Sequence, residues 1–211
     1  KMFNKKNIKI PLDKFIDSAL YHPKNGYYMQ KIPFGQHGDF ITKSGMPTTY
    51  FINFGLLTTG EGLHSLGDLI ASYIQEHFPQ DETWLFGPAY KGIPIVSATA
   101  MSLWRRTGKP VYCAFDRKES KDHGEGGRLL GISCLKNQEV IVIDDVLTQA
   151  TGLRNIKKIL HSLGVVIKAA VVCLDREEKG ERGTSRVDAE CELGFPIHAL
   201  TTISQLRDMP R

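Results

Sequence analysis

The sequence predicts an α/β fold in which a central parallel sheet is flanked by helices on both faces. Three apolar runs, at 84–86, 140–143 and 169–174, are candidate strands bounded by polar or Gly/Pro-containing segments. Each run is continuous rather than alternating, which is typical of parallel strands covered on both sides. In such sheets ligands bind at the carboxyl ends of the strands, so functional residues are expected there.

Segments with helical spacing of apolar residues separate the expected strands. Residues 61–77 carry apolar side chains at Leu63, Leu66, Ile70 and Ile74, and a helix is predicted over this range. Further elements are expected as a helix over 95–106, a strand over 111–115 and a helix that ends at 163 with Gly164 as its cap.

The N-terminal segment has a different character. Residues 11–20 resemble a short amphipathic helix, the stretch 21–39 is broken by proline and glycine, and 50–54 is a candidate strand. We therefore expect residues 1–43 to form an N-terminal hood helix with an insertion, and residues 44–211 to form the main domain. The C-terminal part is expected to contribute to the same small hood.

Composition excludes some classes of protein. The formal net charge of +4 is well short of the basic stripe of a dedicated nucleic-acid binder. No apolar run approaches the length of a membrane span, and the four cysteines form no C-x-x-C pair. We expect a cytoplasmic protein with no nucleic-acid or membrane partner.

Two adjacent acids, Asp144 and Asp145, follow the expected strand at 140–143. Neighbouring carboxylates repel each other, so a fold that keeps them is expected to bind them to something positive or hydroxylated. The small, hydroxyl-containing turn 148–152 comes next and is expected to open a helix, whose backbone N–H groups form a site for one phosphate. A ribose 5-phosphate would use both features. An ordinary turn with an exposed acid pair is the alternative.

This stretch resembles the signature with which type I phosphoribosyltransferases bind 5-phosphoribosyl 1-pyrophosphate (PRPP): an apolar strand, two acids and a small Thr-containing loop. The family usually has Ala-Gly-Thr-Ala where this chain has Gln149-Ala150-Thr151-Gly152. A second match is the loop 86–94, where small residues allow close approach of a ligand and Lys91 would meet a pyrophosphate. By itself this loop is equally a tight turn with one solvated lysine.

The polar, glycine-rich stretch 115–127 is expected to be a mobile surface loop. From Arg117 onward it reads Arg-Lys-Glu-Ser-Lys-Asp-His-Gly-Glu-Gly-Gly, which is similar almost residue for residue to the catalytic lid loop of orotate phosphoribosyltransferases. The resemblance implies a homodimer in which this lid closes over PRPP and reaches the active site of the partner subunit. Such a lid excludes water and brings cations to the departing pyrophosphate.

Two more segments resemble the orotate-binding parts of that family. Residues 43–45 and 50–53 are similar to its entry segment, and Arg176 stands where an arginine pairs with the orotate carboxylate. A planar guanidinium binds a carboxylate through two parallel hydrogen bonds. The implied orotate contacts are Phe51, Ile52, Thr148 and Arg176.

The resemblance covers roughly residues 40–205 and implies transfer of the phosphoribosyl group of PRPP to orotate. The products would be orotidine 5′-monophosphate and pyrophosphate, in de novo pyrimidine (UMP) biosynthesis. Mg²⁺ is the implied cofactor, bound mainly through PRPP with no direct protein ligand. Implied catalytic roles fall on Lys121, His123, Asp144 and Asp145. The implied PRPP contacts are Lys43, Tyr90, Lys91, Arg117, Lys118, Lys121, His123, Asp144, Asp145, Val146, Leu147, Thr148, Gln149, Ala150, Thr151 and Gly152.

Other functions stay open at this point. The first alternative is a phosphoribosyltransferase for a purine or another base, but a neutral purine has no carboxylate with which Arg176 could pair. A PRPP-binding regulator or inactive paralogue would need no lid chemistry. A structural module without a ligand would leave three matching segments at three expected strand ends unexplained.

Overall fold

A computed structural model describes residues 40–41, 47–48, 59–121, 127–131 and 138–207. The chain divides into two compact units, 1–58 and 59–211. In the first unit the described residues form a short antiparallel pair, β1 (Phe40–Ile41) with β2 (Pro47–Thr48). The predicted helix at 11–20, the insertion at 21–39 and the strand at 50–54 lie outside the described residues, so the N-terminal hood and its boundary stay predictions.

The second unit is built on a six-stranded sheet in the order β5-β4-β3-β6-β7-β8. Its strands are β3 (Thr83–Gly87), β4 (Val111–Lys121), β5 (Gly127–Leu130), β6 (Glu139–Leu147), β7 (Val166–Asp175) and β8 (Ile197–Thr202). All neighbouring pairs are parallel except β4 with β5, which is antiparallel. The predicted α/β fold with a central parallel sheet is confirmed.

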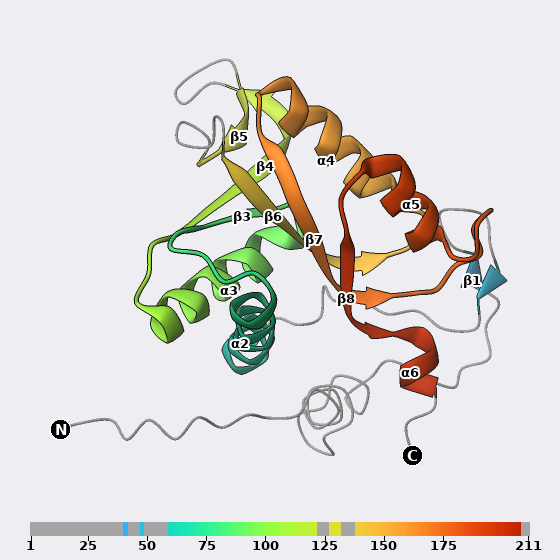
Figure 1. The fold of residues 1–211 in the computed structure, drawn as a ribbon, viewed down its shortest axis with the longest axis horizontal. Helices are drawn as coiled ribbons and strands as arrows, with labels where there is room; N and C mark the ends of the chain where they lie inside the picture. Colours follow the sequence, from blue (N-terminus) through green and yellow to red (C-terminus); the bar gives the residue numbers. More distant parts are fainter. Residues whose placement is uncertain (1–39, 42–46, 49–58, 122–126, 132–137, 208–211) are drawn as a thin grey trace. The chain divides into compact units, whose positions relative to one another are not determined.

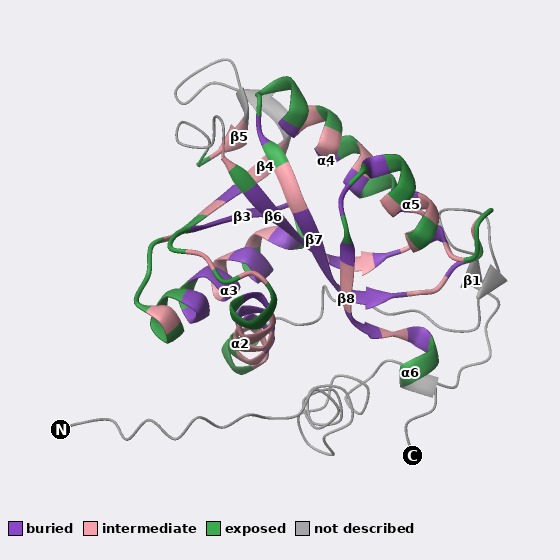
Figure 2. Ribbon diagram, viewed as in Figure 1, coloured by how far each residue is buried: buried purple, intermediate pink, exposed green. Residues whose placement is uncertain are grey.

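Helices cover both faces of this sheet (Figure 1). They are α2 (Gly60–His77), α3 (Gly92–Thr107), α4 (Thr151–Ser162), α5 (Ser185–Leu193) and α6 (Ile203–Arg207). Helices α2 and α3 lie on one face, and α4 and α5 lie on the other. The central strands are buried along most of their length, as Figure 2 shows, which is why their sequences are continuously apolar.

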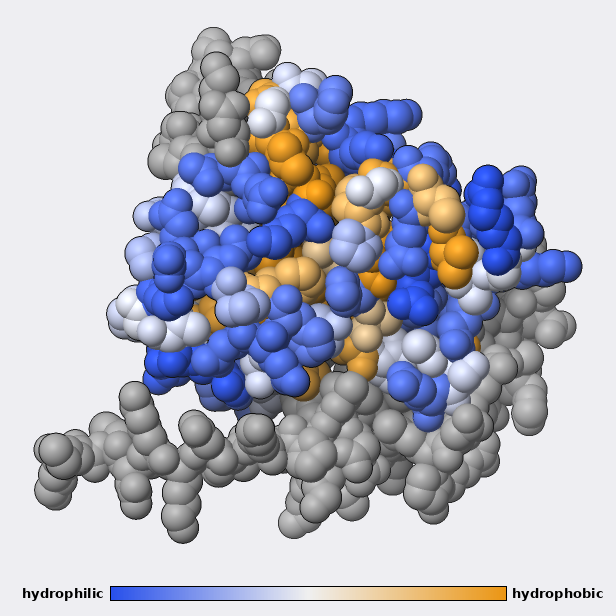
Figure 3. Space-filling model, viewed as in Figure 1, coloured by the Kyte–Doolittle hydropathy of each residue, from blue (hydrophilic) through white to orange (hydrophobic). Residues whose placement is uncertain are grey.

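Helix α4 presents one apolar stripe to the sheet. In α4 the buried residues are Leu153, Ile156 and Leu160, at the spacing of one helix face. They pack in one core with Phe86 and Val142 from the sheet. On the face of the molecule that Figure 3 shows, hydrophilic side chains cover most of the described surface. Among the described residues, no helix is both long and apolar enough to cross a membrane.

β6 runs further than the sequence predicts, and β8 is a strand that was not predicted. β6 continues past the acid pair to Leu147, because Val146 and Leu147 still pair in register with Leu174 and Asp175 of β7. Asp144 and Asp145 therefore lie within the carboxyl half of the strand and not after its end. β8, in the part of the chain expected to join a hood, is an edge strand of the main sheet.

The prediction of a loop over residues 115–127 is wrong for most of this range. β4 continues to Lys121 and pairs with β5 in an antiparallel hairpin, with Phe115 opposite Leu130 and Lys121 opposite Gly127. The pairing of β4 with β3 ends at Phe115, so among the described residues the rest of β4 pairs with the edge strand β5 alone. Only residues 122–126 of the predicted loop lie outside the described residues.

Candidate active site

The predicted acid pair lies where the winding of the sheet reverses. After β3 the chain adds β4 on one side, and it then returns to add β6 on the other side of β3. Because β3 and β6 are parallel neighbours, their carboxyl ends meet at one edge. Such a switch point is the usual ligand site of an open α/β sheet.

Backbone N–H groups and one lysine hold the two carboxylates. The N–H of Asp145 donates to Asp144 Oδ1 at 2.9 Å, and the N–H of Val146 donates to Asp145 Oδ1 at 2.9 Å. The Lys91 ammonium lies 2.8 Å from Asp145 Oδ2. The structure thus brings together the acid pair and the lysine that were predicted from separate motifs, and Lys91 supplies a cation to the pair.

Protonation of the pair is coupled to whatever binds it. Burial and the adjacent charge of Asp145 raise the pKa of the Asp144 carboxyl from 3.8 to about 7, while the N–H of Asp145 and the charge of Lys91 act in the opposite direction. Near neutral pH the pair therefore holds a proton part of the time. A ligand that prefers the charged carboxylates would displace that proton.

The loop that carries Lys91 is closed tightly where the backbones of Gly87 and Gly92 approach each other. The N–H of Gly92 donates to the Pro88 carbonyl at 2.9 Å, and a Cβ on Gly92 would lie 2.5 Å from Pro88 Cδ. The N–H of Ala89 donates to Asp116 Oδ1 at 2.5 Å, which ties this loop to β4. Tyr90 and Lys91 are exposed at its tip, where a ligand can reach both.

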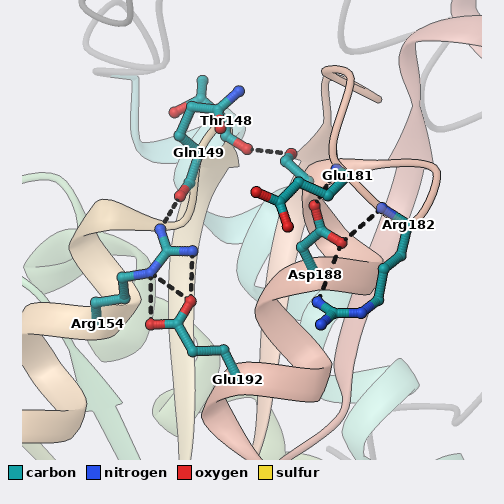
Figure 4. A network of polar contacts seen from close by, with 8 residues as sticks. Thr148, Gln149, Arg154, Glu181, Arg182, Asp188 and Glu192 are labelled. Carbon is teal, nitrogen blue, oxygen red and sulfur yellow. Dashed lines mark hydrogen bonds and ion pairs between the residues drawn. The ribbon is translucent and has the colours of Figure 1, made fainter.

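The turn between β6 and α4 has its carbonyl oxygens held by side chains (Figure 4). The Ser185 hydroxyl donates to the Thr148 carbonyl at 2.5 Å. The Arg154 guanidinium donates to the Gln149 carbonyl and binds both carboxylate oxygens of Glu192 on α5. Since carbonyl oxygens repel a phosphate, these contacts suit a turn whose N–H groups bind one.

The backbone of this turn takes a left-handed conformation at Ala150, where the usual Ala-Gly-Thr-Ala loop has glycine. Ala150 precedes the first residue of α4 and adopts the left-handed conformation, with φ 56° and ψ 18°. This conformation costs an L-residue with a Cβ roughly 1–2 kcal/mol. At Gly152 a Cβ would lie 3.6 Å from Asp144 Oδ2, so the turn lies beside the acid pair.

The end of β7 is joined to the same turn. The N–H of Arg176 donates to the Leu147 carbonyl at 3.1 Å. The Arg176 side chain is only 11% exposed, and its Nε lies 3.8 Å from Glu178 Oε1. The Gln149 amide donates to Glu178 Oε2 at 2.8 Å. Arg176, the predicted orotate ligand, is therefore linked through Glu178 to the predicted phosphate turn.

Comparison with known proteins identifies the family. A family model described as the phosphoribosyl transferase domain matches residues 56–195. An orotate phosphoribosyltransferase of Acinetobacter baumannii is 43% identical over 172 residues, which cover 81% of this chain and 78% of that protein. One from Methylococcus capsulatus is 42% identical over 175 residues, covering 82% and 81%. This chain belongs to the orotate phosphoribosyltransferase family.

A solved structure agrees with this assignment. A crystal structure of orotate phosphoribosyltransferase from Francisella tularensis is similar with a TM-score of 0.66 at 33% identity, and the match covers 81% of each chain. The family resemblance predicted from the sequence is confirmed. Members of the family are enzymes that transfer pentosyl groups, which is a class of glycosyl transfer.

Several predicted site residues of this phosphoribosyltransferase lie beyond what the structure describes. Lys43, Phe51, Ile52 and His123 are outside the described residues, and the side chains of Lys118 and Lys121 are not described. Arg117 is described and half-buried on β4. Its neighbour Asp116 accepts a hydrogen bond from Ala89 in the loop 86–94, which carries Lys91. The roles of all these residues stay predictions.

The sequence did not predict the residues whose side chains hold the loop and the turn of the phosphoribosyltransferase site in place. These are Asp116, Arg154, Glu178, Ser185 and Glu192. Thr184, which caps α5, and Ser185, its first residue, were a recognisable helix-start signal. For Glu178, a single acid in a polar segment, the sequence held no signal, since only its burial sets it apart.

Replacing Ser185 with alanine is expected to raise the KM for PRPP about five-fold. The reason is loss of the bond to the Thr148 carbonyl, which is worth about 1 kcal/mol if it is realised in the bound turn. Steady-state kinetics at saturating orotate measure the effect. The matched control is Ser162→Ala on α4, whose hydroxyl makes the same kind of bond to the Ile159 carbonyl on an exposed turn. Equal KM values for the two variants would contradict the role given to Ser185.

Proposed function

We propose that this enzyme transfers the 5-phosphoribosyl group of PRPP to orotate, forming orotidine 5′-monophosphate and releasing pyrophosphate. One observation carries the proposal: the acid pair with Lys91 and the turn 148–152 lie together at the switch point, and the turn is joined to Arg176 through Glu178. This arrangement supports a donor site beside an acceptor site for a base that carries a carboxylate. Its proposed place is de novo pyrimidine biosynthesis in the cytoplasm.

In the proposed complex each part of the site binds one part of the substrates. Asp144 and Asp145 accept hydrogen bonds from the ribose hydroxyls, and the turn 148–152 binds the 5-phosphate. Tyr90 and Lys91 contact the pyrophosphate, together with Arg117 and Lys43. Thr148, Arg176, Phe51 and Ile52 are the proposed contacts of orotate. Lys118, Lys121 and His123 of the partner subunit would complete the pyrophosphate site in a homodimer.

Catalysis at this site would consist of positioning and charge stabilisation. The bond between C1 and the pyrophosphate oxygen breaks as positive charge develops on the ribose, in an oxocarbenium-like state. Asp144 and Asp145 place negative charge near the ribose, and Lys91 places positive charge where the pyrophosphate departs. Because Lys91 already contacts Asp145, its ammonium would lie between the two developing charges.

Mg²⁺ fits this site as a cation carried by the substrate. Hard cations prefer oxygen ligands, and the acid pair offers them, although Asp145 Oδ2 is already 2.8 Å from Lys91. Among the described residues, no group of three or more His, Cys, Asp or Glu could hold a metal by itself. In the proposed complex most of its ligands come from PRPP, with Asp144 and Asp145 nearby. When bound, Mg²⁺ supplies charge neutralisation of the pyrophosphate.

The decisive test is the loss of orotate absorbance on addition of PRPP, with Mg²⁺ or with EDTA. We expect consumption of orotate with Mg²⁺ and slow or no consumption with EDTA. Adenine and hypoxanthine, measured by the same PRPP dependence, should not be consumed. Consumption of a purine instead would assign another base, and PRPP binding without consumption of any base would assign a regulator.

A further inference from the structure

Glu178 is a buried carboxylate that touches two parts of the proposed site. Its residue is 9% exposed, and it lies on the segment between β7 and α5. One oxygen accepts from the Gln149 amide at 2.8 Å, and the other lies 3.8 Å from Arg176 Nε. Gln149 belongs to the turn proposed for the 5-phosphate, and Arg176 is the proposed ligand of the orotate carboxylate.

The backbone around Glu178 is held in place by short-range pairing. The N–H of Ser185 donates to the Glu178 carbonyl at 2.7 Å, and Lys179 pairs with Thr184 in an antiparallel bridge. The N–H of Gly180 donates to the Gly183 carbonyl at 3.1 Å, which closes this small hairpin. The carboxylate is thus presented from a fixed base, and its position determines where its two partners can lie.

A buried carboxylate makes the two partners dependent on each other. Removing a carboxylate from water is costly unless a cation and hydrogen-bond donors surround it. Arg176 provides the cation and Gln149 provides a donor. A shift of Gln149 when the turn closes on a phosphate therefore changes the interaction energy at Arg176, and the reverse also holds.

We propose that Glu178 is a positioning residue that couples the two substrate sites, so that a phosphate in the turn 148–152 tightens binding of the orotate carboxylate at Arg176. This inference rests on the proposed function. A filled turn fixes Gln149, and Glu178 then holds the Arg176 guanidinium in its binding orientation before orotate arrives. The second ligand has less ordering left to undergo and binds more tightly. By linkage, orotate must tighten binding of the phosphate by the same factor.

The test uses ribose 5-phosphate, which occupies the phosphate turn and cannot react. Calorimetry gives the Kd of orotate with and without saturating ribose 5-phosphate, and the ratio of these Kd values is the coupling factor. We expect a coupling factor of about five or more in the unaltered protein. In Gln149→Glu, where two carboxylates face each other, the factor should fall to about one.

A charge-swapped pair separates coupling from general damage. In the double variant Gln149→Glu with Glu178→Gln the donor and acceptor exchange places, so the side-chain hydrogen bond is restored and the coupling factor should recover at least in part. Thermal melting of each variant reports folding. The matched control is Glu177→Gln, whose neighbouring carboxylate accepts from the Ser204 N–H and not from the turn. Its coupling factor should stay at that of the unaltered protein.

The outcomes distinguish this inference from the proposed function. If the unaltered protein binds both ligands with a coupling factor of one, or if Gln149→Glu keeps the full factor, the role of Glu178 is wrong and the proposed function stands. If the protein binds neither ligand, the proposed function itself fails. A lowered factor in Gln149→Glu that the double variant does not raise at all also overturns the inference, because general damage would then explain it.

Discussion

Replacing Asp145 with asparagine is expected to lower kcat by about 10²–10³-fold while the protein stays folded. The change removes the charge that lies 2.8 Å from Lys91 and weakens the proposed acceptor of a ribose hydroxyl. Asparagine keeps an oxygen that can accept from the Val146 N–H, as Asp145 Oδ1 does. Steady-state kinetics with PRPP and orotate measure the loss, and thermal melting checks the fold.

Asparagine at Asp144 should lower turnover comparably and yet make the protein more stable. Because the pKa of Asp144 is raised from 3.8 to about 7, the folded protein binds more protons than the unfolded chain between these values. The free energy of unfolding therefore falls as pH rises from about 4 to about 7 and levels off above 7. The loss is on the order of 1–4 kcal/mol, and Asp144→Asn, which cannot ionise, avoids it.

Thermal or urea unfolding of Asp144→Asn and of the unaltered protein, each as a function of pH, measures this effect. The stability difference between Asp144→Asn and the unaltered protein should grow as pH rises from about 4 to about 7 and stay constant above that. Asp68→Asn is a suitable control, since Asp68 forms an exposed ion pair with Arg106 on helices away from the acid pair. Near-normal turnover in both site variants would remove the acid pair from the mechanism. A pH-independent stability difference would contradict the shifted pKa.

The central sheet was predictable because its signals are local. The runs at 84–86, 140–143 and 169–174 are apolar without interruption, and each lies within an observed strand. The ends of the strands were less predictable, because pairing with a neighbour determines where a strand stops. β6 carries two carboxylates and still continues to Leu147, since β7 supplies partners for its backbone there.

In the candidate site, too, the residues in local motifs were predictable and those that depend on distant contacts were not. The acid pair, the turn and Lys91 belong to short motifs and were predicted from them. Their supporting residues were not, because the contacts span long stretches of chain. Glu178 is 29 residues from Gln149, and Ser185 is 37 residues from Thr148. Only the packing of α5 beside the turn brings them together, and α5 itself was not predicted.

The hairpin of β4 and β5 shows how composition misled the prediction. Residues from Asp116 to Lys121 are polar and charged, which favours a loop when the strand partner is unknown. The antiparallel partner at 127–130 turns them into the arm of a hairpin. The proposed lid residues Arg117, Lys118 and Lys121 therefore belong to a strand whose register with β5 shifts between Asp116 and Lys121.

Alanine at Lys121 is expected to lower kcat by about 10²-fold or more with the fold intact. Lys121 is the last residue of β4, opposite Gly127, and its proposed role is to bring positive charge to the departing pyrophosphate. Loss of that charge should affect the transition state more than substrate binding, so kcat should fall more than KM rises. The matched control is Lys109→Ala, just before the start of β4, where the lysine pairs with exposed Asp81. Near-normal turnover of Lys121→Ala would exclude it from the lid chemistry.

Mixing two inactive variants tests whether Lys121 acts in the partner's site. In a dimer formed from Lys121→Ala and Asp145→Asn subunits, a lid that crosses between subunits leaves one site with both residues intact. Random exchange of subunits makes about half of the dimers mixed, so about a quarter of the unaltered activity should return. A lid that acts within its own subunit places one defect in each site, so the mixture would stay inactive. Recovery of activity would therefore establish both the dimer and the crossing of the lid, because neither variant alone holds a complete site.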